Sequence, residues 1–276
     1  MKDFYEIKYH QEGHDPLNRS EHSHDNCYEL IHTVSGDGTV LIRDRIYPLQ
    51  PGYLYLINAR NVHCTNPENA GQYVRSKIIF SEDLGRALIG IMGLESTLLH
   101  LLEKKSGGFF PLPEHLSNKA DALFRECAAA AAEETEHSRA IVITALTGIF
   151  LMLVHDAIAA EPEEGNISRV LRYINLHLAE PLSLDVIAKE TFLSKYYLCR
   201  MFHRETGMTV NQYIAHCRIA KARRALTETA STVSDISEQC GFNSISYFTQ
   251  CFREMEGMTP SEYRRKSAKR IPGSPG

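Results

Sequence analysis

Hydrophobic and polar residues follow three different patterns along this chain, and each pattern occupies its own stretch. Between residues 4 and 80, short apolar runs are separated by clusters of Gly, Pro, Asn and Asp. Runs punctuated in this way are typical of antiparallel strands joined by tight turns. The expected strands cover residues 4–9, 28–35, 38–44, 53–58 and 73–80. Because such a series commonly hides its edges by closure, we expect a barrel or sandwich.

Between residues 81 and 160 the apolar positions take a helical spacing. We expect three helices, over residues 84–105, 113–134 and 138–160, with a break at Gly-Gly-Phe-Phe-Pro in between. The last helix is apolar on nearly every side, so more than one of its faces must be buried. Packing beneath the strands or against a second subunit would satisfy this requirement. Its apolar run over residues 140–154 is shorter than the roughly 18 residues of a membrane span, so we expect no membrane segment.

Residues 181–265 carry one helical pattern twice, at an offset of fifty residues. Such a repeat indicates one small unit built two times. The matched positions are Asp185, Phe192, Ser194, Tyr197, Phe202, Gly207, Met208, Thr209 and Tyr213, followed by Asp235, Phe242, Ser244, Tyr247, Phe252, Gly257, Met258, Thr259 and Tyr263.

Each copy is expected to form a short helix, a tight turn and a second helix. Ser183 and Ser194 are the expected N-caps of the first copy, and Gly207 ends its second helix. In the second copy, Thr232 and Asp235 have the spacing of a capping box. Each second helix carries an apolar stripe opposite a polar one, and the polar stripe can exchange hydrogen bonds with base edges in a major groove.

The two copies resemble the DNA-binding domain of the AraC/XylS family of bacterial transcription regulators, through residues 187–226 and 241–265. The resemblance implies two helix-turn-helix motifs joined by a linker helix over residues 211–228. It also implies a homodimeric regulator that binds double-stranded DNA and RNA polymerase. We expect this regulator to be an activator. The expected DNA-contacting residues are Lys195, Tyr196, Cys199, Arg200, His203, Ile245, Ser246, Thr249, Gln250 and Arg253.

Two other interpretations of the repeated helices remain open. They can be ordinary packed helices with solvated polar faces, or they can belong to an architectural DNA binder without an effector.

If the linker helix holds the two second helices about 34 Å apart, they reach major-groove faces roughly 10 base pairs apart, and one subunit reads a whole site.

A second constellation lies in the strand region. His22, His24, Glu29 and Gly36 have the spacing H-x-H-x4-E-x6-G, and His63 follows a later strand. This pattern resembles the cupin barrel, whose members commonly bind a divalent metal through three His and one Glu. The resemblance makes these three histidines and Glu29 candidate metal ligands, suited to Zn, Mn, Fe or Ni. In AraC-type regulators such a barrel senses a small effector such as a sugar, so the same four residues are candidate effector ligands.

The sequence leaves the role of these four residues open. They can line a polar effector pocket, or they can form the metal site of a cupin enzyme fused to a DNA-binding domain. We expect a regulator without catalytic residues, and we assign no definite cofactor. Arg43, Tyr53 and Arg75 are further polar residues on the strands, and each can face the barrel interior or water.

Charge is distributed unevenly along the 276 residues, and this changes the meaning of the net charge of −4. Residues 166–276 contain 16 Lys and Arg against 10 Asp and Glu, whereas residues 1–165 contain 14 against 24. Counterion release from phosphates requires only a local basic surface. The half with the repeats is therefore the half suited to nucleic acid.

These patterns predict a protein of several domains. We expect a cupin-like antiparallel β-barrel over residues 1–80, a helical dimerisation segment over 81–160 and a linker over 161–166. An all-α DNA-binding domain over 167–267 and a disordered tail over 268–276 complete the chain. The seven cysteines form no C-x-x-C pair, which indicates buried thiols in a reducing compartment. The first residues show no signal-peptide pattern, so we expect a cytoplasmic protein.

Overall fold

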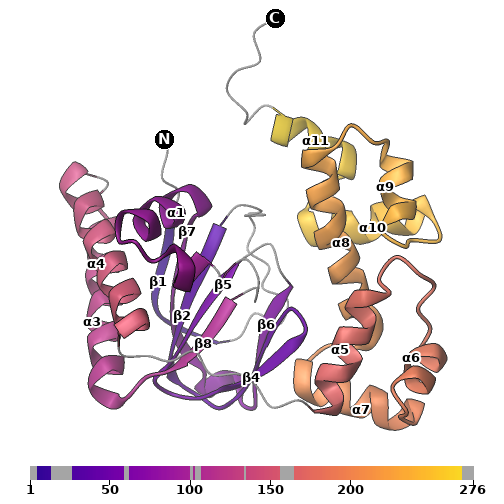
Figure 1. Ribbon diagram of the computed structural model, residues 1–276, viewed down its shortest axis with the longest axis horizontal. Helices are drawn as coiled ribbons and strands as arrows, with labels where there is room; N and C mark the ends of the chain where they lie inside the picture. Colours follow the sequence, from indigo (N-terminus) through magenta and orange to yellow (C-terminus); the bar gives the residue numbers. More distant parts are fainter. Residues whose placement is uncertain are drawn as a thin grey trace, which may run out of the picture. The chain divides into compact units, whose positions relative to one another are not determined.

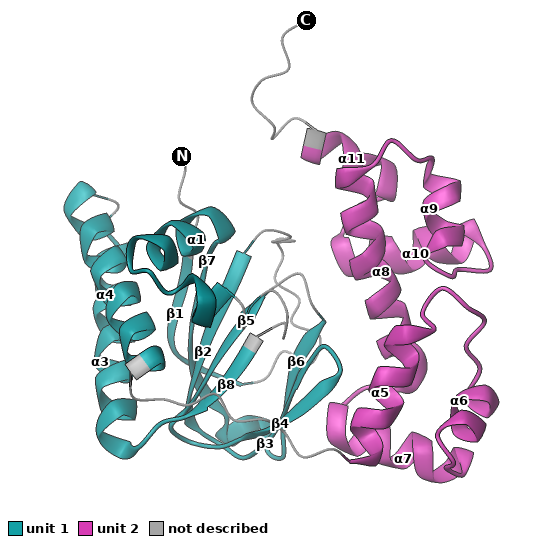
Figure 2. Cartoon of the chain, in the orientation of Figure 1, with its two compact units in different colours: residues 1–16, 26–163 teal, residues 17–25, 164–276 magenta. Residues whose placement is uncertain are grey.

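The computed structural model describes residues 5–13, 27–58, 62–99, 102, 107–133, 135–155 and 165–268. These residues form two compact units, one before residue 156 and one from residue 165 onward (Figure 2). The first unit contains antiparallel sheets and helices, and the second is helical, which confirms the predicted fold class. Residues 161–164 of the expected linker and residues 269–276 of the expected tail lie outside the described residues.

Two antiparallel sheets form the strand part of the first unit. The larger sheet has the order β1-β7-β2-β5-β8, and the smaller has the order β4-β3-β6. The strands are β1 (Tyr5–Glu12), β2 (Cys27–Ser35), β3 (Gly38–Ile42), β4 (Arg45–Leu49), β5 (Tyr53–Asn58), β6 (His63–Pro67), β7 (Val74–Ser81) and β8 (Gly107–Pro111).

Three of these strands differ from the sequence prediction. The expected break at residues 107–111 is wrong, because β8 pairs with β5 and places Phe109 opposite Tyr55. Strand β4 was not expected because Pro48 interrupts its pattern, but β4 lies at the edge of its sheet, where proline is tolerated. Strand β6 was missed because its sequence, HCTNP, is largely polar.

Helices cover the outer face of the larger sheet (Figure 1). They are α1 (Glu82–Ile91), α3 (Glu114–Ala131) and α4 (Glu136–His155). The single helix expected over residues 84–105 is wrong. Helix α1 ends at Ile91, Gly93 adopts a left-handed backbone with φ of 68°, and a short π-helical segment, Glu95–Leu99, follows. Glycine accepts this conformation without steric cost, so it allows the chain to turn here.

Helix α4 is the most apolar of the three α-helices α1, α3 and α4. By length and composition alone, Glu136–Val154 would be able to cross a membrane. Its buried side chains pack instead into the cluster beneath the sheet, where the Phe150 ring lies 5.8 Å from that of Phe80. Leu151 remains 51% exposed, so the described residues leave one part of the helix uncovered.

The second unit is built around one long helix, α8 (Figure 1). Helices α5 to α7 lie at one end of α8, and α9 to α11 lie at the other. The bounds are α5 (Asn166–Leu176), α6 (Leu184–Glu190), α7 (Lys195–Thr206), α8 (Val210–Glu228), α9 (Val233–Gln239), α10 (Ile245–Glu256) and α11 (Pro260–Ala268). The expected linker helix over residues 211–228 is α8.

The local signals that begin and end these helices are confirmed. The Ser183 and Ser194 hydroxyls accept from the amides three residues later, and Gly207 ends α7 with φ of 70°. Thr232 and Asp235 form the expected capping box. Each N-cap satisfies an amide that has no partner inside the helix, and the Gly207 amide donates to His203 O at the other end of α7.

The offset between the two copies is not uniform, which corrects two expected pairings. Up to the turn, the offset is 49: the amides of Phe192 and Gly241 both end the first helix with equivalent bonds, to Lys189 O and Glu238 O. After the turn, the offset is 50, as the caps Ser194 and Ser244 show. The second turn is therefore one residue longer. Phe192 corresponds to Gly241 and Asp185 to Ser234, so the expected matches of Phe192 with Phe242 and of Asp185 with Asp235 are wrong.

Candidate functional site

Helices α7 and α10 have the same construction. Both begin at a serine cap, and both end at a glycine with φ of 70°. Their apolar stripes are buried, as expected from the helical spacing. These stripes are Leu198, Met201 and Phe202 in α7, and Phe248, Cys251 and Phe252 in α10.

Most of the expected DNA-contacting side chains lie on exposed parts of these two helices. Tyr196 is 72% exposed and Ile245 is 47% exposed, while Cys199 and Thr249 are half-buried. The remaining exposed members are Lys195, Arg200, His203, Ser246, Gln250 and Arg253. The arrangement gives each helix one face for packing and one that is free to meet a partner. Whether the exposed face meets DNA remains a prediction.

Several polar groups on the exposed stripes already have partners nearby. Lys195 Nζ lies 2.9 Å from Asp185 Oδ2, and the Arg200 guanidinium lies over the Tyr196 ring, 5.5 Å from its centroid. Gln250 Nε2 donates to Glu254 Oε1 at 2.9 Å. Contacts between exposed charged or polar groups are weak in water, so a base edge can compete for these side chains.

Three exposed aromatic residues on the same two motifs were not among the expected DNA-contacting residues. Tyr197 and Tyr247 are 44% and 52% exposed, and Phe192 is 87% exposed. The repeat itself gave the signal for the two tyrosines, because they occupy matched positions. Phe192 was misplaced because the sequence repeat paired it with the buried Phe242.

Arg218 of α8 joins the two helix-turn-helix copies. Its Nε donates to Leu178 O at 3.0 Å, and its Nη2 donates to Glu180 O at 2.8 Å, beyond the end of α5. The same guanidinium lies 5.8 Å from the Phe242 ring centroid in the second copy. A Cβ at Gly241 would lie 2.5 Å from Leu178 O, so only glycine permits this close approach. The end of α5, helix α8 and the second turn therefore meet at one point.

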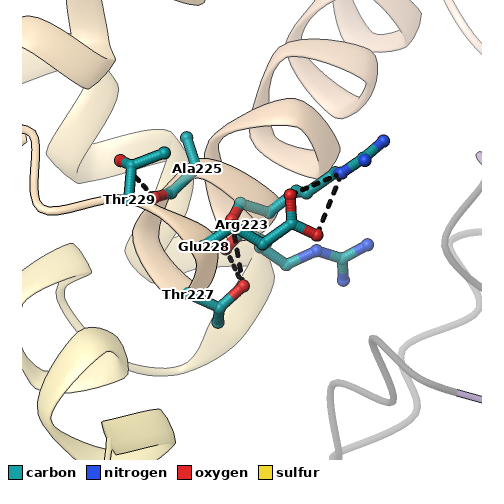
Figure 3. A network of polar contacts seen from close by, with 6 residues as sticks. Arg223, Ala225, Thr227, Glu228 and Thr229 are labelled. Carbon is teal, nitrogen blue, oxygen red and sulfur yellow. Dashed lines mark hydrogen bonds and ion pairs between the residues drawn. The ribbon is translucent and has the colours of Figure 1, made fainter.

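The C-terminal end of α8 is fixed by a second set of polar contacts (Figure 3). Thr227 Oγ1 donates to the carbonyls of Arg223 and Arg224, and Thr229 Oγ1 donates to Ala225 O at 2.7 Å. The Thr229 amide also donates to Ala225 O, at 3.1 Å, so the amide and the hydroxyl of Thr229 together cap this carbonyl. The Arg224 guanidinium pairs with Glu228 on the surface, with Nε 2.9 Å from Oε2.

Two further arginines hold the second copy to α8. Arg223 Nη1 lies 3.1 Å from Glu256 Oε1 at the end of α10, and both side chains are largely buried. Arg264 of α11 donates to Leu226 O and to Ser231 O. These contacts fix α10 and α11 relative to the linker helix.

In the first unit, Glu29 and His63 meet as expected from the cupin-like spacing. His63 Nε2 donates to Glu29 Oε2 at 2.8 Å, although one residue lies on β2 and the other on β6 of the other sheet. Lys77 of β7, which the sequence analysis did not select, lies 3.3 Å from Glu29 Oε1. Alternation along the strands would have placed Glu29 and Lys77 on one face, but their pairing required the strand register.

Electrostatics keeps Glu29 ionised inside the protein. Burial raises its pKa, but Lys77 and His63 outweigh this effect and lower the pKa to about 2. A buried carboxylate is retained in its charged form when opposite charges and hydrogen bonds surround it. Glu29 therefore holds a full negative charge at neutral pH.

The expected metal site remains a prediction, because His22 and His24 lie outside the described residues. The described part of the site fits a metal poorly. The Lys77 ammonium already contacts the Glu29 carboxylate, which would have to bind the metal ion. Lys77 and the metal ion would therefore compete for the same negative charge. Among the described residues, no group of three or more His, Cys, Asp or Glu side chains is arranged to hold a metal.

An apolar and aromatic cluster lies between the two sheets of the first unit. Tyr55 Oη donates to Pro48 O at 2.5 Å, and the Phe109 ring lies 5.0 Å from the Tyr53 ring. The cluster consists of Ile31, Val40, Ile42, Tyr47, Leu49, Tyr55, Ile57, Tyr73 and Phe109, with Tyr53 packed against it. Of the further polar strand residues, Arg75 is buried and Arg43 is exposed.

Comparison with known proteins matches both units. A family model described as an AraC-like ligand binding domain matches residues 4–150, which is more than half of the chain, and one described as a helix-turn-helix domain matches residues 187–266. The chain is similar to the HTH-type transcriptional activator RhaR of Salmonella arizonae, with 27% identity over 270 residues, 90% of this chain and 88% of that protein.

Two further proteins are similar to this chain. RhaR of Escherichia coli O9:H4 is 26% identical over 279 residues, covering 91% of this chain and 89% of its own length. Among solved structures, a transcriptional regulator with an AraC-type DNA-binding domain from Chromobacterium violaceum is 30% identical. It covers 39% of this chain and 95% of its own, with a TM-score of 0.36.

Proposed function

Because the chain belongs to the AraC family, we propose that it is a transcriptional activator that binds double-stranded DNA when a small effector occupies its sensor unit. The observation that carries this proposal is the matched construction of α7 and α10. Each is a capped helix with one buried stripe and one exposed polar stripe, and α8 connects them without a break.

The exposed stripes are suited to base edges in adjacent major grooves. Arg200 would donate to guanine, and Gln250 would form paired hydrogen bonds with adenine. Lys195, His203 and Arg253 would lie toward phosphates, which hold the protein in register but carry no sequence information. Since both helices are fixed to α8, one subunit would read two half-sites at a constant separation.

The effector would act by binding one arrangement of the protein more tightly than another. A ligand shifts a conformational equilibrium only by its difference in affinity for the two states. We place the effector between the two sheets, where Glu29, His63 and Lys77 supply charged hydrogen-bonding groups beside an aromatic cluster. The partly uncovered α4, with Leu151 exposed, supports a homodimer through this helix, and RNA polymerase is the proposed partner at the promoter.

The test is selection of binding sites from random duplex DNA with the full chain, in the presence and absence of candidate effectors such as sugars, sugar phosphates and aromatic acids, followed by footprinting. We expect two protected half-sites roughly 10 base pairs apart. Arg200→Ala and Gln250→Ala should each weaken binding at least tenfold and relax the base preference of different half-sites, since each bidentate contact is worth about 1–3 kcal/mol. Arg172→Ala, an exposed arginine on α5, is the matched control. Failure to enrich any sequence, or unchanged affinity in both variants, would exclude the proposal.

A further inference from the structure

A row of polar side chains crosses the inner face of the larger sheet, at a distance from Glu29. Gln11 of β1 pairs directly with Arg75 of β7, and Arg75 pairs directly with Thr33 of β2. Directly opposed residues place their side chains on the same face of a sheet. Thr33 follows Ile31 of the inner aromatic cluster by two positions, so the row faces the smaller sheet.

Three buried polar atoms around this row form no well-aligned hydrogen bond of normal length within the described residues, although the Thr33 hydroxyl lies near Tyr55 and the Tyr73 hydroxyl lies near Thr65 and Arg75. They are Gln11 Oε1, Thr33 Oγ1 and the Tyr73 hydroxyl, and Tyr73 lies two positions before Arg75. Folded proteins leave few such atoms, and a cluster of them needs an explanation. Burial raises the pKa of Tyr73 to about 12, so its hydroxyl keeps its proton and can donate.

Arg75, at the centre of the row, is a buried cation that pairs with no carboxylate in the part of the chain that the structure describes. It is 6% exposed, its Nη1 donates to Gly13 O at 2.9 Å, and it lies 5.1 Å from the Tyr73 ring centroid. No carboxylate among the described residues pairs with it, although arginine is almost never buried unpaired. Glu29 is bound to Lys77 and lies four residues from Thr33 along β2, a distance of about 13 Å.

We propose that Arg75, with Gln11, Thr33 and Tyr73, binds an oxyanion group of the effector, so that the effector is a small organic acid or a phosphate ester. A guanidinium binds a carboxylate or phosphate through paired parallel hydrogen bonds. The Thr33 and Tyr73 hydroxyls donate to the same group, and Gln11 Oε1 accepts from a hydroxyl next to it. A neutral ligand would leave the buried charge uncompensated. This inference rests on the proposed function, because it names the ligand class of the sensor unit.

Calorimetric titration of the full chain with matched probes tests the assignment. Each of a panel of sugar acids and sugar phosphates, such as glucuronate and glucose 6-phosphate, is compared with its neutral parent sugar. At least one acid should bind at least 100-fold more tightly than its parent, and the carboxylate and phosphate series identify which oxyanion is preferred. A neutral parent that binds as tightly as its acid, or a panel in which no acid binds, overturns the assignment.

Variants separate a ligand-binding role of Arg75 from a structural one. Arg75→Met should lower the affinity for the acid at least tenfold and raise the melting temperature of the ligand-free chain, because it removes an uncompensated buried charge. Thr33→Val should lower the affinity several-fold with little change in melting temperature. Arg125→Met, at an exposed site on α3, is the control and should change neither. A lower melting temperature of ligand-free Arg75→Met, or unchanged acid binding, would show that Arg75 is structural.

The two proposals fail in different ways. If a neutral sugar alters the footprint on the selected DNA while Arg75 is dispensable, only the oxyanion assignment is lost. If the acids bind through Arg75 but no DNA sequence is selected, the ligand site stands and the regulatory function is lost.

Discussion

Phe192 and Gly241 occupy the same position in the two helix-turn-helix copies, and both have a left-handed backbone, with φ of 58° and 87°. A non-glycine residue in this conformation is strained by about 1–2 kcal/mol. The Phe192 side chain is 87% exposed, so packing within the chain recovers little of that cost. The first turn therefore carries strain that the second turn avoids.

We expect Phe192→Gly to raise the free energy of unfolding by up to about 1 kcal/mol, because relief of strain exceeds the extra chain entropy of glycine. Gly241→Ala, its matched counterpart, should lower it by more than about 2 kcal/mol. It adds the same strain, and its Cβ would lie 2.5 Å from Leu178 O. Urea denaturation followed by circular dichroism measures the free energy of unfolding of both variants. A large loss of stability in Phe192→Gly would mean that the phenyl ring has a packing role.

Replacing Arg218 should change how strictly the two half-sites must be spaced. Arg218→Lys loses the forked pair of hydrogen bonds to Leu178 O and Glu180 O, at a cost of about 1–3 kcal/mol. We expect wild type to bind selected DNA poorly when one base pair is inserted between the half-sites. The same insertion should cause a smaller loss of affinity in Arg218→Lys. Arg224→Lys, whose partner Glu228 is on the surface, should behave as wild type. Equal spacer discrimination in both variants would show that Arg218 does not set the separation.

Removal of Lys77 should destabilise the first unit strongly. Lys77→Met leaves the buried Glu29 carboxylate without its cation, a change that costs about 3–5 kcal/mol at pH 7. The double variant Glu29→Gln with Lys77→Met should recover most of this loss, because neither charge remains. A double-mutant cycle by urea denaturation gives the coupling free energy. If the two losses simply add, the ion pair contributes little.

The pH dependence of stability should have a component from His32. Burial lowers the His32 pKa to about 4, from 6.5 in the unfolded chain. Between these values only the unfolded state binds the proton, so the contribution is present above pH 6.5 and is lost as the pH falls toward 4. The loss amounts to about 3 kcal/mol. His32→Gln should remove this slope, and unfolding curves between pH 7 and pH 4 measure it. An unchanged slope in this variant would assign it to other groups.

Acid unfolding should show a second, lower window from Glu29. Its pKa is about 2 in the folded protein against an ordinary value of 4.5, so its contribution is present above pH 4.5 and is lost between 4.5 and 2. Glu29→Gln should flatten this window and leave the His32 window intact. The two variants therefore test separate groups in one set of titrations.

Local sequence signals predicted the second unit well because its helices begin and end at residues with specific chemistry. Ser194 and Gly207 identify the ends of α7 through hydrogen bonds to nearby residues. The exceptions were the matches expected for Asp185 and Phe192, because a one-residue insertion in a turn changes the alignment of the copies without leaving a gap signal. Only hydrogen-bond geometry revealed it.

The first unit was harder to predict because its sheets depend on contacts distant in sequence. Strand β8 pairs with β5 about fifty residues earlier, so its Gly-Gly-Phe-Phe-Pro sequence resembles a break when taken alone. The spacing of Glu29 and His63 correctly suggested that they meet, but it did not indicate Lys77. Likewise, Arg75 was a candidate with an undetermined orientation until its register with Gln11 and Thr33 was known.

Helix α8 contributes side chains at both of its ends: the Tyr213 hydroxyl accepts from Asn175 Nδ2, and Ile219, Ala222 and Leu226 belong to the hydrophobic cluster of the second copy. One helix thus supports both helix-turn-helix motifs. Local melting of its middle would remove support from both, so amide hydrogens throughout this region should exchange at a common slow rate, as a single cooperative foldon. A fragment that contains one motif and a truncated α8 should therefore not fold independently.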